Sequence, residues 1–186
     1  MTTKLREHFA KHSDAVEKSI EALDGPTASA SGAIVDCLRK GGKILTFGNG
    51  GSAAEASHLA EELVGKFRKN RRPFPAICLT ADSGTVTCIA NDFGYESVFV
   101  RQVDAFAQPG DVAVALTTSG KSENVNRALR AAHLRGAVTI ALTGTAGLSG
   151  AEADHVIAVP SSDSAIIQEV HLMIIHLFCE AVEDLA

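Results

Sequence analysis

The chain has 186 residues, of which 46% are apolar and 21% charged, and its formal net charge is −5. This length predicts a single domain (residues 1–186) with a sizeable core, and the apolar content excludes an intrinsically disordered chain. The acidic balance argues against nucleic-acid binding. The one basic cluster, "KFRKNRR" at residues 66–72, could touch nucleic acid, but we favour its interpretation as a solvated helix end and loop.

Cysteine usage and hydropathy predict a cytoplasmic protein. Cys37, Cys78, Cys88 and Cys179 are scattered through apolar segments without paired spacing. They therefore resemble small core residues rather than a disulfide or zinc framework. No charged-then-apolar leader opens the chain, and we find no apolar run near the roughly 18 residues of a membrane helix.

Helices and strands alternate along the chain. Two helical stretches, residues 5–23 and 27–38, come first and are separated by "DGP". Short apolar runs then follow: "KILTFG", "PAICLT", "DVAVALT", "VTIALTG" and "HVIAVP". These runs are typical of parallel strands that are buried on both faces. A helix is expected between Ser122, as its N-cap, and Gly136, and a long helix covers residues 166–185.

This alternation predicts an α/β fold. Right-handed crossovers would place helices on both faces of a five-stranded parallel sheet, which makes a three-layer, doubly wound sandwich. Additional helices precede the sheet and a long helix ends the chain. Ligands of such sheets bind beyond the carboxyl ends of the strands.

Two loops rich in glycine and hydroxyl groups follow predicted strands. The first, "GNGGSA", has three glycines and Ser52, and the second, "TTSGKSENV", has Thr117, Thr118, Ser119 and Ser122 around Gly120. Backbone N–H groups and the helix dipole favour an anion at such positions. Neither loop matches a nucleotide-binding pattern, so a phosphomonoester is the favoured ligand. Alternatively, these residues serve only as turn formers and caps.

Polar side chains on two helices add a second kind of site. His58 and Glu62 are spaced i, i+4 and therefore project from one side of their helix. They could be metal ligands or a base with its partner, and the alternative is an ordinary surface pair. In the last helix His176 stands among apolar residues, with Gln168 two turns earlier; a satisfied core histidine is the alternative. His171 lies on the same helix and stays open between a site residue and a structural one, with the structural role favoured.

Histidine, carboxylate and amide oxygen together suit a divalent metal such as Zn²⁺. Asn91 and Asp92, in "ANDFG", form either a substrate-facing turn or a helix C-cap before Gly94.

Four motifs in register carry a resemblance to a known family: "GNGGSAAEASHLAEEL", "IANDFG", "TTSGKSENV" and "IIQEVHLMIIH". In order and spacing they resemble the sugar isomerase (SIS) domain family over nearly the whole chain, and within it the sedoheptulose 7-phosphate isomerases, or phosphoheptose isomerases. The resemblance implies a homotetramer with active sites at subunit interfaces, to which helices within residues 1–40 would contribute contacts. It also implies conversion of D-sedoheptulose 7-phosphate to D-glycero-D-manno-heptose 7-phosphate, the first step toward ADP-heptose.

The resemblance also assigns residues. The implied substrate-binding residues are Asn49, Gly50, Gly51, Ser52, Glu62, Asn91, Asp92, Thr117, Thr118, Ser119, Ser122 and Gln168. The implied zinc ligands, for one ion per subunit, are His58, Glu62, Gln168 and His176. Glu62 and His176 are also the implied base and acid. The chain departs from its relatives just before "IQE", where Ala165 and Ile166 replace a polar or arginine residue.

The isomerisation expected here needs a base to move a proton between neighbouring carbons through an enediol. Glu62 is the expected base, and His176 is expected to move protons between the two oxygens. The competing class is a non-catalytic SIS protein, which would bind a phosphosugar or act as a scaffold for a replication initiator. The complete set of His58, Glu62, Gln168 and His176 favours the enzyme.

Overall fold

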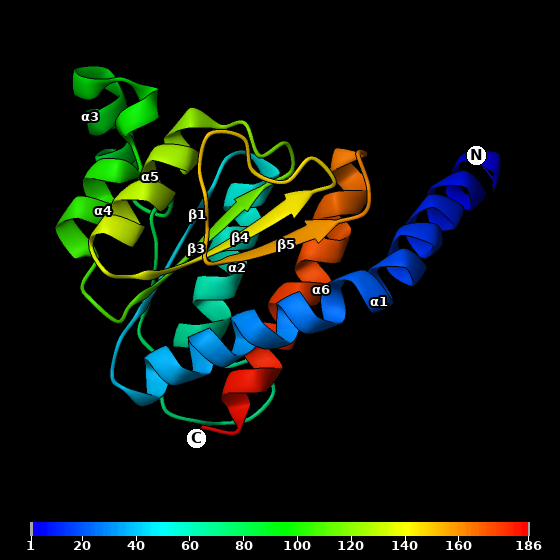
Figure 1. The fold of residues 1–186 in the computed structure, drawn as a ribbon, viewed down its shortest axis with the longest axis horizontal. Coiled ribbons are helices and arrows are strands. Elements are labelled where there is room, and N and C mark those ends of the chain that lie inside the picture. Colours follow the sequence, from blue (N-terminus) through cyan, green and yellow to red (C-terminus); the bar gives the residue numbers. More distant parts are fainter. Residues whose placement is uncertain (1, 186) are drawn as a thin grey trace.

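The computed structural model describes residues 2–185 and shows a five-stranded parallel sheet between two helical layers (Figure 1). The strands are β1 (Ile44–Gly48), β2 (Ala76–Cys78), β3 (Val112–Thr117), β4 (Val138–Gly144) and β5 (His155–Val159). Their order across the sheet is β2-β1-β3-β4-β5. The predicted fold class and all five predicted strands are confirmed.

Two separate cores cover the two faces of the sheet. One layer contains α1 (Thr2–Arg39), α2 (Gly51–Val64) and α6 (Ser164–Glu183). The other contains α3 (Ser83–Phe93), the short 3₁₀ helix η1 (Tyr95–Ser97), α4 (Val100–Phe106) and α5 (Glu123–Leu134). Strands β1 and β3 are buried throughout. The edge strands are not, since Ile77 in β2 is 36% exposed and Val156 in β5 is 38% exposed. The prediction that all five strands are buried on both faces is therefore wrong for the edge strands β2 and β5.

The expectation of two N-terminal helices is also wrong, because α1 runs unbroken through Gly25 and Pro26. Proline removes one backbone hydrogen bond, and its ring normally clashes with the Cβ of the residue before it. Here that residue is a glycine, which has no Cβ. Buried Leu23 and Ala30 on either side pack into the core under the sheet, which favours continuing the helix. Figure 1 shows the N-terminal part of α1 extending beyond the rest of the molecule.

The long last helix, α6, begins after Asp163, whose carboxylate accepts a hydrogen bond from the Ala165 N–H at 3.1 Å. By length and composition α6 would pass as a membrane span, contrary to the sequence-based expectation. Half of its most apolar stretch is buried inside the protein. This is the pattern of a core helix, and α6 packs against both α1 and α2.

The sheet order places a topological switch point between β1 and β3, where the chain leaves the two strands toward opposite layers. The helix after β1, α2, joins the layer of α1 and α6, whereas the helix after β3, α5, joins the opposite layer. Ligands of doubly wound sheets bind at such a point because the two loops diverge there. Both glycine and hydroxyl loops lie at this position.

Candidate active site

The first loop, residues 48–52, connects β1 to α2 through a tight backbone approach. A Cβ on Gly48 would lie 2.8 Å from the carbonyl oxygens of Leu116 and Ser52, so no larger residue fits there. Gly50 has a φ of 57°, in the left-handed region that glycine adopts readily. Ser52 is buried in the first turn of α2. At its glycine positions the loop therefore presents backbone rather than side chains.

Asn49 joins this loop to the opposite layer through its side-chain amide. Its Nδ2 donates to Asn124 Oδ1, and Asn124 Nδ2 donates back to Asn49 Oδ1, each at 2.9 Å. The hydroxyl of Tyr95 donates to the same Asn49 oxygen at 2.9 Å. Neither Asn124 nor Tyr95 was predicted from the sequence. The available signal was that Asn124 stands in the first turn of a predicted helix directly after the loop.

The second loop, residues 117–122, runs from β3 into α5. Thr117 is buried, and its hydroxyl oxygen accepts a hydrogen bond from the Gly120 N–H at 3.2 Å, so this side chain shapes the loop. Ser119 is exposed and Ser122 occupies the N-cap position of α5. Thr118 Oγ1 accepts from Ser164 Oγ, at the start of α6, at 3.3 Å. The second loop is thus connected to the helix that carries Gln168 and His176.

Three of the four predicted ligands meet between α2 and α6. His58 Nε2 lies 3.2 Å from His176 Nε2 and 3.6 Å from Glu62 Oε1. Glu62 is largely buried, with 17% of its side chain exposed. On the other side of the ring, His58 Nδ1 lies 3.2 Å from Glu61 Oε1. A carboxylate at Nδ1 favours the tautomer that leaves Nε2 free to bind a metal or accept a proton.

Gln168 lies farther along the same pair of helices, against the first loop. A Cβ on Gly51 would overlap the side-chain amide of Gln168, so glycine makes room for this amide. His176 is half-buried rather than part of the core, and the ring of Phe67 stacks on it with centroids 5.4 Å apart and an interplanar angle of 27°. The core-histidine alternative for His176 is therefore wrong. Ile166 is buried and Ala165 is exposed.

The donor set fits a metal ion. Ligand atoms about 2.0–2.1 Å from a tetrahedral zinc ion stand about 3.4 Å apart. The two separations measured from His58 Nε2, 3.2 Å to His176 and 3.6 Å to Glu62, bracket this value. Glu61 belongs to the same cluster of potential ligands but approaches the other ring nitrogen of His58, where it would orient the ring.

Glu55 is a half-buried glutamate that was not predicted from the sequence, and its Oε2 atom is buried. It precedes His58 by three residues and Glu62 by seven, so all three share one face of α2. Burial raises the pKa of Glu55 from 4.5 to about 8, and its Oε2 has no hydrogen-bond partner among the described residues. The face of α2 that carries the predicted ligands thus also holds a carboxyl group that is protonated near neutral pH.

His171 is the structural histidine of α6, as predicted. It is fully buried, and its Nε2–H donates to the Thr143 carbonyl at 3.1 Å. Burial lowers its pKa from 6.5 to about 4, so the ring is neutral.

Asn91 and Asp92 lie in the last turn of α3, just before Gly94 ends the helix with a φ of 84°. The backbone therefore matches the helix-end alternative. Both side chains are exposed, and Asn91 Nδ2 donates to Asp92 Oδ1 at 2.7 Å. Their segment reaches the first loop through Tyr95, which directly follows Gly94.

Comparison with known proteins identifies the family. Residues 7–144 match the model of the SIS domain family. The chain is 46% identical over 186 residues to a phosphoheptose isomerase of Aquifex aeolicus (strain VF5), covering 100% of this chain and 97% of that protein. It is 47% identical over 181 residues to a phosphoheptose isomerase of Maridesulfovibrio salexigens, covering 97% of this chain and 88% of that protein.

Solved structures agree with the sequence relatives. The phosphoheptose isomerase of Neisseria gonorrhoeae superposes with a TM-score of 0.90 at 39% identity, with 98% of both chains covered. The phosphoheptose isomerase of Francisella tularensis gives a TM-score of 0.92 at 36% identity, again with 98% of both chains covered. The chain therefore belongs to the SIS domain family, in its phosphoheptose isomerase branch.

Proposed function

We propose that this protein is an aldose–ketose isomerase that converts D-sedoheptulose 7-phosphate into D-glycero-D-manno-heptose 7-phosphate, the first step toward ADP-heptose. The observation that carries the proposal is the meeting of Glu62, His58 and His176 between α2 and α6, beside two loops suited to a phosphorylated sugar. The full-length similarity to phosphoheptose isomerases supports the same substrate.

Glu62 is the group that moves the proton between the carbons. As a carboxylate it would take the proton from the carbon beside the carbonyl, leaving an enediol, and return it to the neighbouring carbon. His176 would transfer a proton between the two sugar oxygens, since imidazole can donate and accept near neutral pH. The largely buried position of Glu62 limits competition from water for its oxygens.

The two loops would hold the rest of the sugar phosphate. The residues proposed to hold the phosphate are Thr117, Thr118, Ser119 and Ser122, with the exposed Ser119 as a direct donor and Thr117 as a residue that shapes the loop. Those proposed to contact the sugar chain are Asn49, Gly50, Gly51, Ser52, Asn91, Asp92 and Gln168. Binding energy from the phosphate would orient the distant reacting carbons.

A zinc ion is the proposed cofactor, one per subunit, held by His58, Glu62, Gln168 and His176. When bound, it would supply Lewis-acid chemistry that stabilises negative charge on the reacting oxygens. Metal analysis of the purified protein tests this, with His58→Ala expected to lose the ion because one of four ligands is gone. The control is His133→Ala, at an exposed position on α5. Equal metal content in both variants would remove His58 from the ligand set.

The deciding experiment is incubation with D-sedoheptulose 7-phosphate followed by NMR of the products. Appearance of the aldose heptose phosphate would establish the activity. Binding of the sugar phosphate without conversion would instead support a non-catalytic phosphosugar-binding SIS protein, in which the same residues act only as a recognition site.

We also propose that the protein is a cytoplasmic homotetramer with its active sites at subunit interfaces. A groove between α1 and α6 supports the assembly, since its lining includes Val16, Ile20, Leu23, Met173, Ile174 and Leu177. Ile20 is 67% exposed and Leu177 is 48% exposed in the single chain, and burying such side chains against another subunit is favourable. All four cysteines are free thiols, as suits a reducing compartment.

A further inference from the structure

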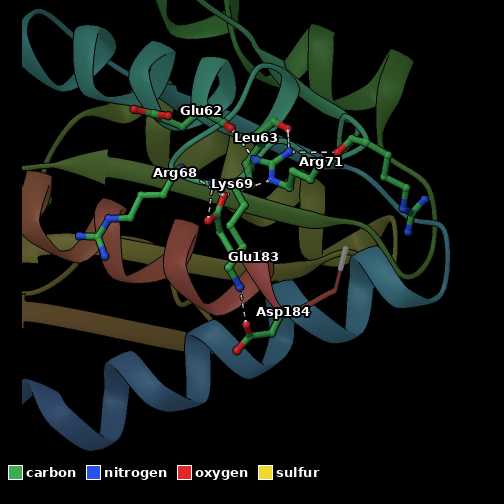
Figure 2. Close-up of polar contacts among 8 residues, drawn as sticks. Glu62, Leu63, Arg68, Lys69, Arg71, Glu183 and Asp184 are labelled. Carbon is green, nitrogen blue, oxygen red and sulfur yellow. Dashed lines mark hydrogen bonds and ion pairs between the residues drawn. The ribbon is translucent and has the colours of Figure 1, made fainter.

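The basic segment 66–72 differs from the solvated loop that the sequence predicted. Although Lys66, Arg68 and Lys69 are exposed, the Arg71 side chain has an exposed fraction of 0%. Figure 2 shows Arg71 turned back onto the end of α2, between that helix and the end of α6. An arginine is seldom buried so completely unless its charge and its donors are matched by partners.

The guanidinium group of Arg71 binds the last turn of α2. Its Nη2 donates to the Glu62 carbonyl at 2.7 Å and its Nη1 donates to the Leu63 carbonyl at 3.0 Å. The last carbonyl groups of a helix have no partners within the helix, and a cation is favourable at that end. Arg71 therefore fixes the backbone of Glu62, the residue whose side chain we assign as the base.

Glu183, near the end of α6, forms an ion pair with the arginine but no hydrogen bond (Figure 2). Its carboxylate lies 3.5 Å from Arg71 Nε and accepts hydrogen bonds from the backbone N–H groups of Arg68 at 3.2 Å and Lys69 at 2.9 Å. Glu183 is only 5% exposed, so this ion pair is little screened by solvent. The pair joins the end of α2 to the end of α6.

The same segment also contacts His176 directly, since the Phe67 ring stacks on the His176 ring. One stretch of chain thus touches both proposed proton-transfer residues, the backbone of Glu62 through Arg71 and the ring of His176 through Phe67. These two residues lie on different helices, and their relative position depends on how α2 and α6 are held together.

We propose that Arg71, paired with Glu183, is a positioning residue that sets Glu62 opposite His176. This inference rests on the proposed isomerase function. Proton transfer requires the base within hydrogen-bond reach of the proton, and a displacement of about 1 Å can cost about 10²-fold in rate. The Leu63 carbonyl also accepts a hydrogen bond from the Phe74 N–H at 3.0 Å, so the Glu62 carbonyl is the one that depends on Arg71. Without Arg71 the Glu62 carbonyl would lose this hydrogen bond, and the Glu62 side chain would shift.

The test compares Arg71→Lys and Arg71→Met with the wild-type protein. Lysine keeps a charge beside Glu183 but cannot donate to two carbonyl groups with a forked geometry, and methionine removes the charge as well. We expect kcat to fall about 10–100-fold in both, the range for losing a group that orients a ligand or base, with KM changed less than threefold. Each assay is run well below the melting temperature of the variant, so that loss of stability alone does not lower kcat.

Arg72→Lys and Arg72→Met are the matched controls, because Arg72 is the next residue, is exposed, and places its guanidinium over the Phe74 ring. Their kcat should match that of the wild type. If Arg71→Met fails to fold, Arg71→Lys decides the question. A kcat for Arg71→Lys equal to that of Arg72→Lys would overturn the proposal and leave Arg71 a purely structural residue.

A second readout separates this proposal from the proposed function. If the wild-type protein does not isomerise the sugar, the proposed function fails, and the position of Glu62 is then followed by NMR of its side-chain carboxyl carbon. We expect this signal to move in Arg71→Lys and to stay in Arg72→Lys. An unmoved signal in Arg71→Lys would show that Arg71 does not position Glu62, whatever the activity.

Discussion

His171 and His176 stand on the same helix but face different surroundings. His176 is half-buried and meets His58 through its Nε2, whereas His171 is fully buried against β4. The neutral, buried ring of His171 donates one hydrogen bond, and its Nδ1 has no partner among the described residues. Thus His176 is partly accessible at the proposed site, whereas the burial of His171 makes stability depend on pH.

Acid should destabilise the protein through His171. Its pKa is about 4 in the folded state and 6.5 in its ordinary state, so the unfolded chain binds more protons between these values. Stability is therefore complete above pH 6.5 and falls as the pH drops toward 4, by about 3 kcal/mol from this group. Urea unfolding of the wild type and of His171→Gln, which cannot titrate, should give curves that converge as the pH falls.

The control for this titration is His133→Gln, because His133 is exposed on α5. Its pH dependence should run nearly parallel to that of the wild type, because its ion pair with Asp154, at 3.7 Å, is open to solvent. If His171→Gln also runs parallel to the wild type over the same pH range, burial of His171 does not contribute to the acid sensitivity.

Glu62→Gln should abolish most turnover while leaving the fold in place. Glutamine keeps the size of the side chain but cannot accept the proton, so kcat should fall by at least about 10²–10⁴-fold, the contribution of general base catalysis. Sugar phosphate affinity, measured by titration, should change far less. In deuterated water the wild type should place deuterium at carbon 2 of the aldose, because the carboxylate exchanges its proton with solvent.

Glu62 is also a proposed metal ligand, so metal content is measured for the same variant. Loss of metal together with activity, with partial recovery on adding zinc, would indicate that Glu62 acts chiefly as a ligand. Near-normal turnover of Glu62→Gln at full metal occupancy would contradict its assignment as the base.

At the scale of the elements, the turn from β1 to α2 contains two glycines with different tasks. Gly48 is needed for the stability of the fold, and Gly51 makes room for a proposed site residue. Gly48 lies between two backbone carbonyl groups, whereas Gly51 faces the end of the Gln168 side chain. Backbone held in a sheet cannot move without disturbing its neighbours, but a glutamine side chain can rotate away.

Alanine substitutions at the two glycines should therefore have different effects, with Gly48→Ala lowering stability and Gly51→Ala weakening binding. Gly48→Ala should lower the melting temperature, because its Cβ would press on the Leu116 carbonyl in β3. Gly51→Ala should keep a melting temperature close to that of the wild type but displace the Gln168 amide, which weakens metal and substrate binding. Thermal melts and zinc titrations of both variants check this. A Gly51→Ala protein with wild-type zinc affinity would contradict the assignment of Gln168 as a ligand.

Features set by local pattern could be predicted from the sequence. The five strands were found because their apolar runs are short and bounded by turns, and the shared face of His58 and Glu62 followed from helical spacing. The meeting of His58 with His176 could not be derived from spacing, since it depends on how α2 packs against α6.

Features set by contacts across the fold were missed. The continuity of α1 through Pro26 depends on packing around it, and the burial of Arg71 depends on Glu183, far away in the sequence. The pairing of Asn49 with Asn124 likewise joins residues 75 apart. Local propensity describes such residues as breakers, solvated charges or turn formers, because their partners are brought near only by the sheet.

At the scale of the whole molecule, the exposed apolar side chains of α1 and α6 predict self-association. Met173→Glu would place a charge in the groove between these helices, where Met173 is 45% exposed. Burying an unpaired charge in an interface is costly, so the variant should dissociate into smaller species in analytical ultracentrifugation. Activity should fall with dissociation if the active sites lie at subunit interfaces.

The control is Leu134→Glu, since Leu134 is 86% exposed on α5, in the opposite layer. It should sediment like the wild type. An unchanged sedimentation coefficient for Met173→Glu would show that this groove is not a subunit interface.

The reciprocal amide pair of Asn49 and Asn124 spans the switch point between the two loops. Since one amide follows β1 and the other begins α5, the pair keeps the two loops at a fixed separation before any sugar arrives. The conformational entropy of ordering these loops is thus lost during folding rather than during binding. A sugar phosphate would meet two loops whose separation is set in advance, so the length of the sugar, rather than loop closure, would decide which sugars place their carbonyl group at Glu62.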